Sequence, residues 1–137
     1  MKKKIIISAI VLFTASLIFS LLFYDQFNRV EVSADQLSQQ YSADKEKADG
    51  LYLDKIIEVK GTVKAYYTLL QTSKVLELNA NNTNLPVICF FLDQNNTQKA
   101  GELREGQSVV ITGKCVGTDS YSFVKGVKIN VKDIDVN

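Results

Sequence analysis

The chain has 137 residues, of which 46% are apolar and 23% are charged, and its formal net charge is +1. This length accommodates one domain and a short additional segment. The sequence contains no histidine and two cysteines, so it lacks the commonest general base of enzymes and has few of the ligands that zinc prefers. The near balance of 16 basic and 15 acidic residues is not the strongly positive charge that favours nucleic-acid binding.

The first predicted element, within residues 1–24, is an apolar helix over Ile5–Tyr24, a stretch without charge, proline or glycine. A helix of this length rises about 30 Å, which matches the hydrocarbon core of a membrane. Because Lys2–Lys4 precede it, the positive-inside rule predicts a single-pass transmembrane anchor with the N-terminus in the cytoplasm and the domain outside. The alternative is a signal segment whose cleavage would release an exported soluble domain. Without Lys2–Lys4 the chain has 13 basic and 15 acidic residues, a net charge of −2.

Residues 25–32 are predicted to be a short polar linker, and residues 33–54 an amphipathic helix. Ser33 is a suitable N-cap, and Gln36 three residues later completes a capping box. Four apolar side chains then recur on one helical face, with charged residues between them. They are Leu37, Tyr41, Ala48 and Tyr52. We expect this face, between about residue 34 and residue 50 or 52, to pack on the domain that follows.

From residue 55 to the C-terminus the apolar period changes to two, which is typical of strands. The first strand alternates through Ile57, Val59, Gly61 and Val63, with these side chains inward. Four more strands follow, with a short helix between the third and the fourth. The predicted ranges are 74–80 with Leu76 and Leu78 inward, 87–93, the helix at 98–103, 107–117, and 124–136 with Val127, Ile129 and Val131 inward.

Five strands with a helical connection after the third predict a mainly β fold, the five-stranded Greek-key barrel called the OB-fold. A small barrel closes only if its long strands bend, and glycine permits the bend and leaves room where another strand crosses. Gly61 and Gly113 each interrupt an apolar strand on its inward face. An open antiparallel sheet or a sandwich, with incidental glycines, is the alternative.

Several short motifs in this order resemble the bacterial tRNA_anti-like family of small OB-fold domains, over roughly residues 34–131. They are Leu37 and Tyr41 in the helix, Ala48-Asp49, Tyr52, Lys55, Gly61-Thr62-Val63, Cys89, and Gly113-Lys114-Cys115 with Gly117. The resemblance implies an OB-fold and implies neither an activity nor an established ligand. The chain departs from the family pattern at Asp44 and Asp54 and lacks a late cysteine that many relatives carry.

Cys89 and Cys115 are candidates for a disulfide if the domain lies outside the cytoplasm. The alternative is two separate buried thiols that act as small hydrophobic side chains. The oxygen-rich segments at 79–84 and 93–96 do not have the ligand spacing of a calcium loop and are typical of turns. We therefore expect no metal, no cofactor and no enzymatic activity.

The ligand-binding face is predicted from the way OB-folds bind, across their second and third strands and between two flanking loops. Aromatic side chains with lysines nearby are what stacking of a single-stranded nucleic acid or a sugar would require. The candidate residues are Lys64, Tyr66, Tyr67, Phe90, Lys114, Tyr121, Phe123 and Lys125. The alternative is that these rings fill the barrel and close its ends.

The sequence thus predicts a membrane-anchored extracytoplasmic OB-fold binding module without enzymatic activity. Its membrane contact would be residues 5–24, and its ligand a protein or another envelope component. The alternative is a domain that binds a single-stranded nucleic acid or an oligosaccharide. The net charge of −2 and the predicted location both argue against nucleic acid.

Overall fold

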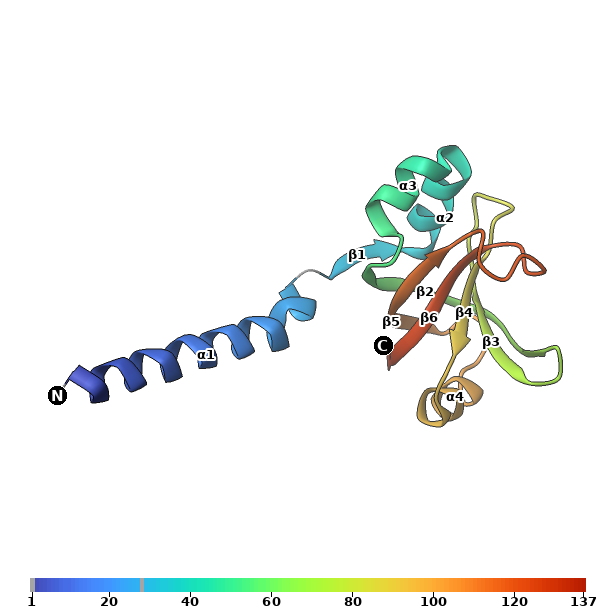
Figure 1. Cartoon of the computed structure of the whole chain (residues 1–137). Coiled ribbons are helices and arrows are strands. Elements are labelled where there is room, and N and C mark those ends of the chain that lie inside the picture. Colours follow the sequence, from blue (N-terminus) through green and yellow to red (C-terminus); the bar gives the residue numbers. More distant parts are fainter. Residues whose placement is uncertain (1, 28) are drawn as a thin grey trace.

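The computed structural model describes residues 2–27 and 29–137; inside α1, the side chains of residues 2, 4, 5, 8, 9 and 24–27 are outside the described set. The elements in chain order are α1 (Lys2–Phe27), β1 (Val30–Ser33), α2 (Ala34–Ala43), α3 (Lys45–Tyr52), β2 (Ile56–Leu69), β3 (Ser73–Leu78), β4 (Val87–Phe91), α4 (Gln94–Gly101), β5 (Ser108–Gly117) and β6 (Val127–Val136) (Figure 1).

Five of the strands form a closed barrel, in agreement with the predicted OB-fold. The order is β2-β3-β4-β6-β5, and an additional pairing of β2 with β5 closes the cylinder. In that closing pair, Val59 lies opposite Ile111. The predicted inward residues of β2, β3 and β6 are buried, except for the half-buried Gly61. The alternating pattern therefore identified the core side of these strands correctly.

The two strand glycines make room for different neighbours. At Gly113 the register of β5 against β6 shifts, and a Cβ atom there would overlap the Asn130 carbonyl oxygen and lie 2.8 Å from Ile129 Cγ2. This is the close strand crossing that the sequence predicts. A Cβ atom on Gly61 would instead lie 3.1 Å from the Ala34 Cβ atom. Gly61 therefore makes room chiefly for a helix that packs on the barrel, whereas the strand residue Leu78 of β3 would lie at an ordinary contact distance of 3.4 Å from the added Cβ atom.

β1 is a strand where a linker is predicted. Val30–Ser33 pairs in parallel with β2, with Val32 opposite Val59, and Val32 is 6% exposed. Four residues are too short for a convincing period-two pattern, and a parallel pairing depends on contacts far along the chain. Of the predicted linker over residues 25–32, residues 25–27 thus belong to α1 and residues 30–32 to β1.

The predicted amphipathic helix is divided into α2 and α3 at Asp44. Asp44 has an extended backbone (φ −156°, ψ 96°), and its side chain accepts a hydrogen bond from the Lys47 backbone N–H. The capping box of Ser33 and Gln36 is present, as predicted. The four apolar residues of the predicted face, Leu37, Tyr41, Ala48 and Tyr52, are all buried against the barrel. An aspartate that caps a second helix thus ends the first one while the apolar face continues.

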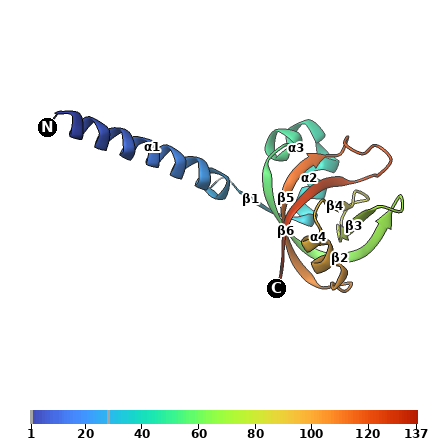
Figure 2. The same cartoon turned by 60° about the horizontal axis from the view of Figure 1, so that its bottom comes forward.

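The 26-residue helix α1 projects away from the barrel in both views (Figures 1 and 2). Taking only the residues that the structure describes, none of the helices combines the length and the apolar character that crossing a membrane requires. The predicted transmembrane anchor over residues 5–24 is therefore not supported. That stretch includes Ile5, Ser8, Ala9 and Tyr24, whose side chains are outside the described set.

We predict that Gly113→Ala lowers the free energy of unfolding by about 1–3 kcal/mol, because the added methyl group must displace the backbone of β6. The matched control is Gly50→Ala in α3, where a Cβ atom would have no neighbour within 4 Å. This change should raise the free energy of unfolding by about 0.5–1 kcal/mol, because alanine is the better helix former. Denaturant titration measures both, and equal effects would contradict the crossing at Gly113.

Candidate functional site

The outer face of β3 and β4 carries an apolar cluster that is separate from the barrel core. Tyr67 lies opposite Val75, and Val75 lies opposite Phe90, so the three side chains form a row across β2, β3 and β4. Val75, Ile88, Phe90 and Val124 are buried together, with Tyr67 and Leu69 packed against them. This is the face on which OB-folds bind their ligands. We call these six residues the outer cluster.

The loop 118–126 between β5 and β6 covers the outer cluster and extends it with two exposed rings. The Tyr121 ring lies 4.8 Å from the Phe90 ring, measured between centroids, and the Phe123 ring lies 6.4 Å from that of Tyr121. Tyr121 is 40% exposed and Phe123 is 62% exposed. Tyr121 has a φ of 51°, which costs an aromatic residue conformational energy. Two aromatic surfaces are thus presented to solvent beside a packed third one.

The hairpin tip between β2 and β3 presents a further apolar side chain to this face. Thr72 donates its backbone N–H to the Leu69 carbonyl oxygen at 3.2 Å, and Leu70 and Gln71 both have positive φ, at 50° and 65°. Such turns favour asparagine and glycine. Leu70, here 69% exposed, instead lies with Phe90, Tyr121 and Phe123 around a small cavity of about 120 Å³. Leu92, 71% exposed, lines the same cavity.

The predicted lysines are less concentrated than the rings. Lys64 forms an ion pair of 2.7 Å with Glu77. The hydrogen bond to the Glu77 carboxylate raises the pKa of this lysine. Lys114 lies on β5 and forms an ion pair of 3.5 Å with Asp54. Lys125 is exposed in the loop beside Val124. The face therefore has a modest positive charge, partly neutralised by Glu77.

Tyr66 belongs to the barrel and not to the outer face, as the alternative for the rings predicts. Its hydroxyl donates to the Thr97 carbonyl oxygen at 3.2 Å, and its ring lies 6.4 Å from that of Phe91. Burial raises its pKa. Because adjacent strand residues point to opposite sides, Tyr66 closes the end of the barrel beside α4 while Tyr67 faces outward. The structure thus brings together Tyr67, Phe90, Tyr121 and Phe123, and separates Tyr66 from them.

A family comparison agrees with this architecture. The family model tRNA_anti-like matches residues 1–128. The chain belongs to the tRNA_anti-like family. A comparison with curated protein sequences finds no match.

Solved structures with similar folds are distant in sequence. A lipoprotein from Klebsiella pneumoniae, proposed as nucleic acid-binding, is 17% identical with a TM-score of 0.55, over 78% of this chain and 90% of that one. A protein proposed as an aspartyl-tRNA synthetase from Leishmania major is 12% identical with a TM-score of 0.53, over 80% of this chain but only 21% of that one. The OBody NL8 domain bound to hen egg-white lysozyme is 17% identical with a TM-score of 0.51, over 61% of this chain and 94% of that one. At these identities the likeness shows the shared fold.

The motifs that mark this tRNA_anti-like chain meet at the junction between the helices and the barrel. Asp54 donates its backbone N–H to the Cys115 carbonyl oxygen at 2.8 Å, and the Cys115 N–H donates to the Lys55 carbonyl oxygen at 3.0 Å. The Tyr41 hydroxyl oxygen lies 3.6 Å from Cys115 Sγ, and burial raises the pKa of this tyrosine. A Cβ atom on Gly117, which has a φ of 71°, would lie 3.1 Å from Leu53 Cδ1. These residues hold the fold together and lie away from the outer cluster.

The candidate disulfide is not formed. Cys89 and Cys115 are both free and buried. Cys89 lies opposite Ile129 of β6, and Ile129 lies opposite Cys115, so the two cysteines are two strand spacings apart. That is about 9–10 Å, which exceeds the Cα separation of about 7 Å that a disulfide tolerates. The alternative of two separate buried thiols is therefore correct.

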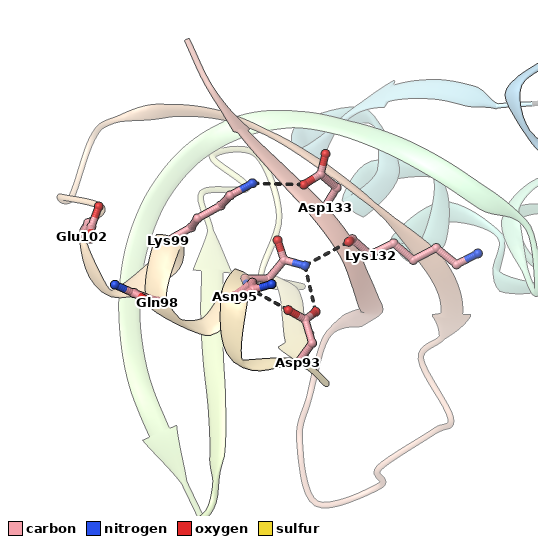
Figure 3. A pocket seen from close by; sticks show the side chains of 8 residues that line it. Asp93, Asn95, Gln98, Lys99, Glu102, Lys132 and Asp133 are labelled. Atoms are coloured by element: carbon pink, nitrogen blue, oxygen red, sulfur yellow. Dashed lines mark hydrogen bonds and ion pairs between the residues drawn. The ribbon is translucent and has the colours of Figure 1, made fainter.

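A polar groove of about 680 Å³ lies at the other end of the barrel, between α4 and β6 (Figure 3). Asn96 donates from its side-chain amide to Asp93 Oδ2 at 2.8 Å and to the Lys132 carbonyl oxygen at 2.9 Å. Asp93 also caps α4 by accepting the Asn96 backbone N–H, and this hydrogen bond lowers the aspartate pKa. Lys99 pairs with Asp133 at 3.3 Å. The polar groups that line the groove thus bind one another, and their hydrogen bonds and ion pair hold α4 on the barrel.

No metal centre stands out in the described part of the chain. There, no three His, Cys, Asp or Glu side chains are grouped closely enough to hold a metal ion.

The sequence prediction missed three residues of the outer face: Leu70, Leu92 and the buried Lys128. The sequence signal for the two leucines was an apolar side chain at a hairpin tip, Leu70, and another at the end of a strand, Leu92, because exposed apolar residues there favour a binding surface.

We predict that neither thiol of the folded chain reacts with a disulfide reagent such as dithiodipyridine, and that both react in guanidinium chloride. Burial raises the pKa of both thiols, so folding favours their neutral forms. The contribution of the two neutral thiols to the free energy of unfolding is therefore complete below the unfolded thiol pKa of about 8.5, and it falls as the pH rises above that value. Absence of reactive thiols in the denatured, unreduced chain would contradict the free cysteines.

Proposed function

We propose that this domain is a non-catalytic binding module that holds a short single-stranded nucleic acid on the outer cluster. The observation that carries the proposal is the pair of exposed rings, Tyr121 and Phe123, which continue the packed ring of Phe90 across the ligand face of an OB-fold. Flat apolar surfaces in succession suit unpaired bases, because every base has a stacking face. The proposal adopts the alternative that the sequence analysis gave, in place of its first choice.

Two comparisons support this choice of ligand. The lipoprotein from Klebsiella pneumoniae is proposed to bind nucleic acid, and the Leishmania major protein is proposed to be an aspartyl-tRNA synthetase. Each shares the fold with this chain at low sequence identity, and the synthetase is much the longer protein. The aromatic residues of this chain therefore provide the main support for a nucleic-acid ligand, and the two similar structures show that the same architecture occurs in such proteins.

The charge of the domain sets the expected mode of binding. The net charge of −2 without Lys2–Lys4 is an average over the chain, whereas the outer face has Lys64 and Lys125 against Glu77. Two lysines contact few phosphates, so stacking must supply most of the affinity. Each phosphate contact with a single strand contributes about −0.7 to the slope of log K against log salt concentration. We therefore expect a shallow slope, between about −1 and −2.

A second candidate ligand is an apolar segment of a protein. Leu70 and Leu92 are 69% and 71% exposed beside Phe123, and exposed aliphatic side chains favour protein contacts over base stacking. The OBody NL8 domain bound to lysozyme has the same fold. Neither candidate depends on attachment to a membrane, because the outer face lies within residues 64–128.

We predict that the chain, purified in a mild detergent, binds a fluorescein-labelled oligodeoxythymidine of about 12 nucleotides. Phe123→Ala should weaken this binding by about 1–3 kcal/mol, the usual contribution of one stacked base, which corresponds to roughly 5–150-fold in Kd. Fluorescence anisotropy measures the affinity. Because Phe123 is 62% exposed, the thermal unfolding midpoint should hardly change.

The matched control is Leu51→Ala, which removes an apolar side chain that is 43% exposed on α3, away from the outer cluster. It should leave the affinity unchanged. An oligonucleotide that does not bind, or that binds equally to wild type and Phe123→Ala, would exclude nucleic acid on this face. A protein from envelope extract that wild type and Leu51→Ala retain, but Phe123→Ala does not, would then favour the second candidate.

A further inference from the structure

We propose that Lys128 is a phosphate-binding residue of the outer face that the loop 118–126 conceals in the unliganded domain. This inference rests on the proposed function, because it names a residue and a conformational step of the same site. Lys128 would contact the ligand only after the loop has moved away from the face. The evidence comes from the direction of its side chain, its burial, its hydrogen-bond partner and the way in which the loop is held.

Lys128 lies on the ligand face of β6. Its neighbours Val127 and Ile129 belong to the barrel core, so the alternation of the strand directs Lys128 outward. In the ladder it lies opposite Ile88 of β4 and opposite Gly117 of β5. Ile88 is a member of the outer cluster. The lysine therefore stands beside the row of Val75 and Phe90, on the surface that a ligand would cover.

An outward-facing lysine should be exposed, but this one has a relative exposed surface of 0%. Its ammonium group donates a hydrogen bond to the Thr118 carbonyl oxygen, which belongs to the covering loop. Burial lowers the pKa of Lys128. Proteins seldom bury a lysine fully, because the charge must be desolvated and one carbonyl oxygen compensates for this only in part. A hydrophobic residue of similar size would suit the fold better, which suggests that the charge serves another purpose.

Two hydrogen bonds tie the loop to its flanking strands, one from the Ser120 hydroxyl to the Val116 carbonyl oxygen at 2.9 Å and one from Lys128 to Thr118. Few other contacts hold it. Val124 is its side chain in the outer cluster, and Tyr121 packs on Phe90. Asp119 forms an exposed ion pair of 3.0 Å with Lys45. Gly117, with a φ of 71°, directly precedes the loop, and Gly126, with a φ of 143°, is its last residue. Figure 2 shows the loop on the same side of the barrel as β3 and β4. Segments with so little buried apolar surface open most readily.

Movement of the loop would uncover Lys128 together with Val75, Ile88 and Phe90. The ammonium would then exchange the neutral Thr118 carbonyl oxygen for a phosphate oxygen, and a hydrogen bond between two charged groups is the stronger one. The same movement would carry Tyr121 and Phe123 to new positions beside the ligand. In this way a face with modest visible charge would gain a cation at the moment of binding.

The experiment measures anisotropy with the same labelled oligodeoxythymidine, over a range of salt concentrations, for the full chain in detergent. We expect Lys128→Met to weaken binding about tenfold or more, as loss of a hydrogen bond to a charged group does, and to make the salt slope shallower by about 0.7. Lys128→Arg should restore the slope, because it keeps the charge. The control Lys47→Met, at an exposed position of α3, should change the affinity little.

The outcomes separate this inference from the proposed function. If wild type binds and Lys128→Met binds with the same affinity and slope, the inference is wrong and the proposed function stands. If wild type does not bind the oligonucleotide, both fail. A melting curve for each variant identifies an effect of unfolding. An unfolded Lys128→Met would show that the buried lysine is needed for the fold, and it would overturn the inference.

Two further measurements test the concealment and the source of the phosphate. Amine acetylation followed by mass spectrometry should label Lys128 far more slowly than Lys125 in wild type, and Val124→Ser should accelerate labelling at Lys128; equal labelling in wild type would refute the concealed lysine. Anionic phospholipid in the micelle offers the same phosphate chemistry. Displacement of the oligonucleotide by this lipid in wild type but not in Lys128→Met would overturn the assignment to nucleic acid.

Discussion

The pairing of β2 with β5 is the constraint on which the rest of the structure depends. It turns a ladder of strands into a closed cylinder and so gives every strand an inner and an outer side. The bend that permits closure is at Gly113, where the backbone of β6 passes too close for any side chain. Once the cylinder is closed, each second residue is directed outward, whatever its polarity.

This constraint explains why a second apolar cluster exists. The strand β4 has the sequence VICFF, in which no polar residue marks an outer side. Closure directs Val87 and Cys89 into the core and leaves Ile88 and Phe90 outside. The domain covers these two with the loop 118–126, which in turn exposes the rings of Tyr121 and Phe123. An apolar outer face under a lightly held loop is the arrangement from which we infer ligand binding.

The part of the fold that follows from local patterns could be predicted from the sequence. The period-two strands, the capping box at Ser33 and the buried helix face through Leu37 and Tyr41 each arise from neighbouring residues. The parallel strand β1 could not be predicted, because it depends on pairing with residues far along the chain. The separation of the two cysteines likewise depends on the strand order, in which β6 lies between β4 and β5.

The candidate site was predictable to a similar extent. Loop and strand positions brought Tyr67, Phe90, Tyr121 and Phe123 together, because OB-folds place these elements side by side. Tyr66 lies on the barrel side and not with these rings, since alternation permits only one of two adjacent tyrosines on a face. Lys128 was missed because alternation predicts an exposed lysine there, and only the folded loop buries it.

The measurement that tests the central claim most directly is a heteronuclear NMR titration of the labelled chain with the oligodeoxythymidine. If the outer face is the ligand site, amide shifts will concentrate at Val75, Phe90 and residues 118–126, and residues of α4 will be unaffected. Shifts confined to the polar groove between α4 and β6, with none on β3 and β4, would contradict the account.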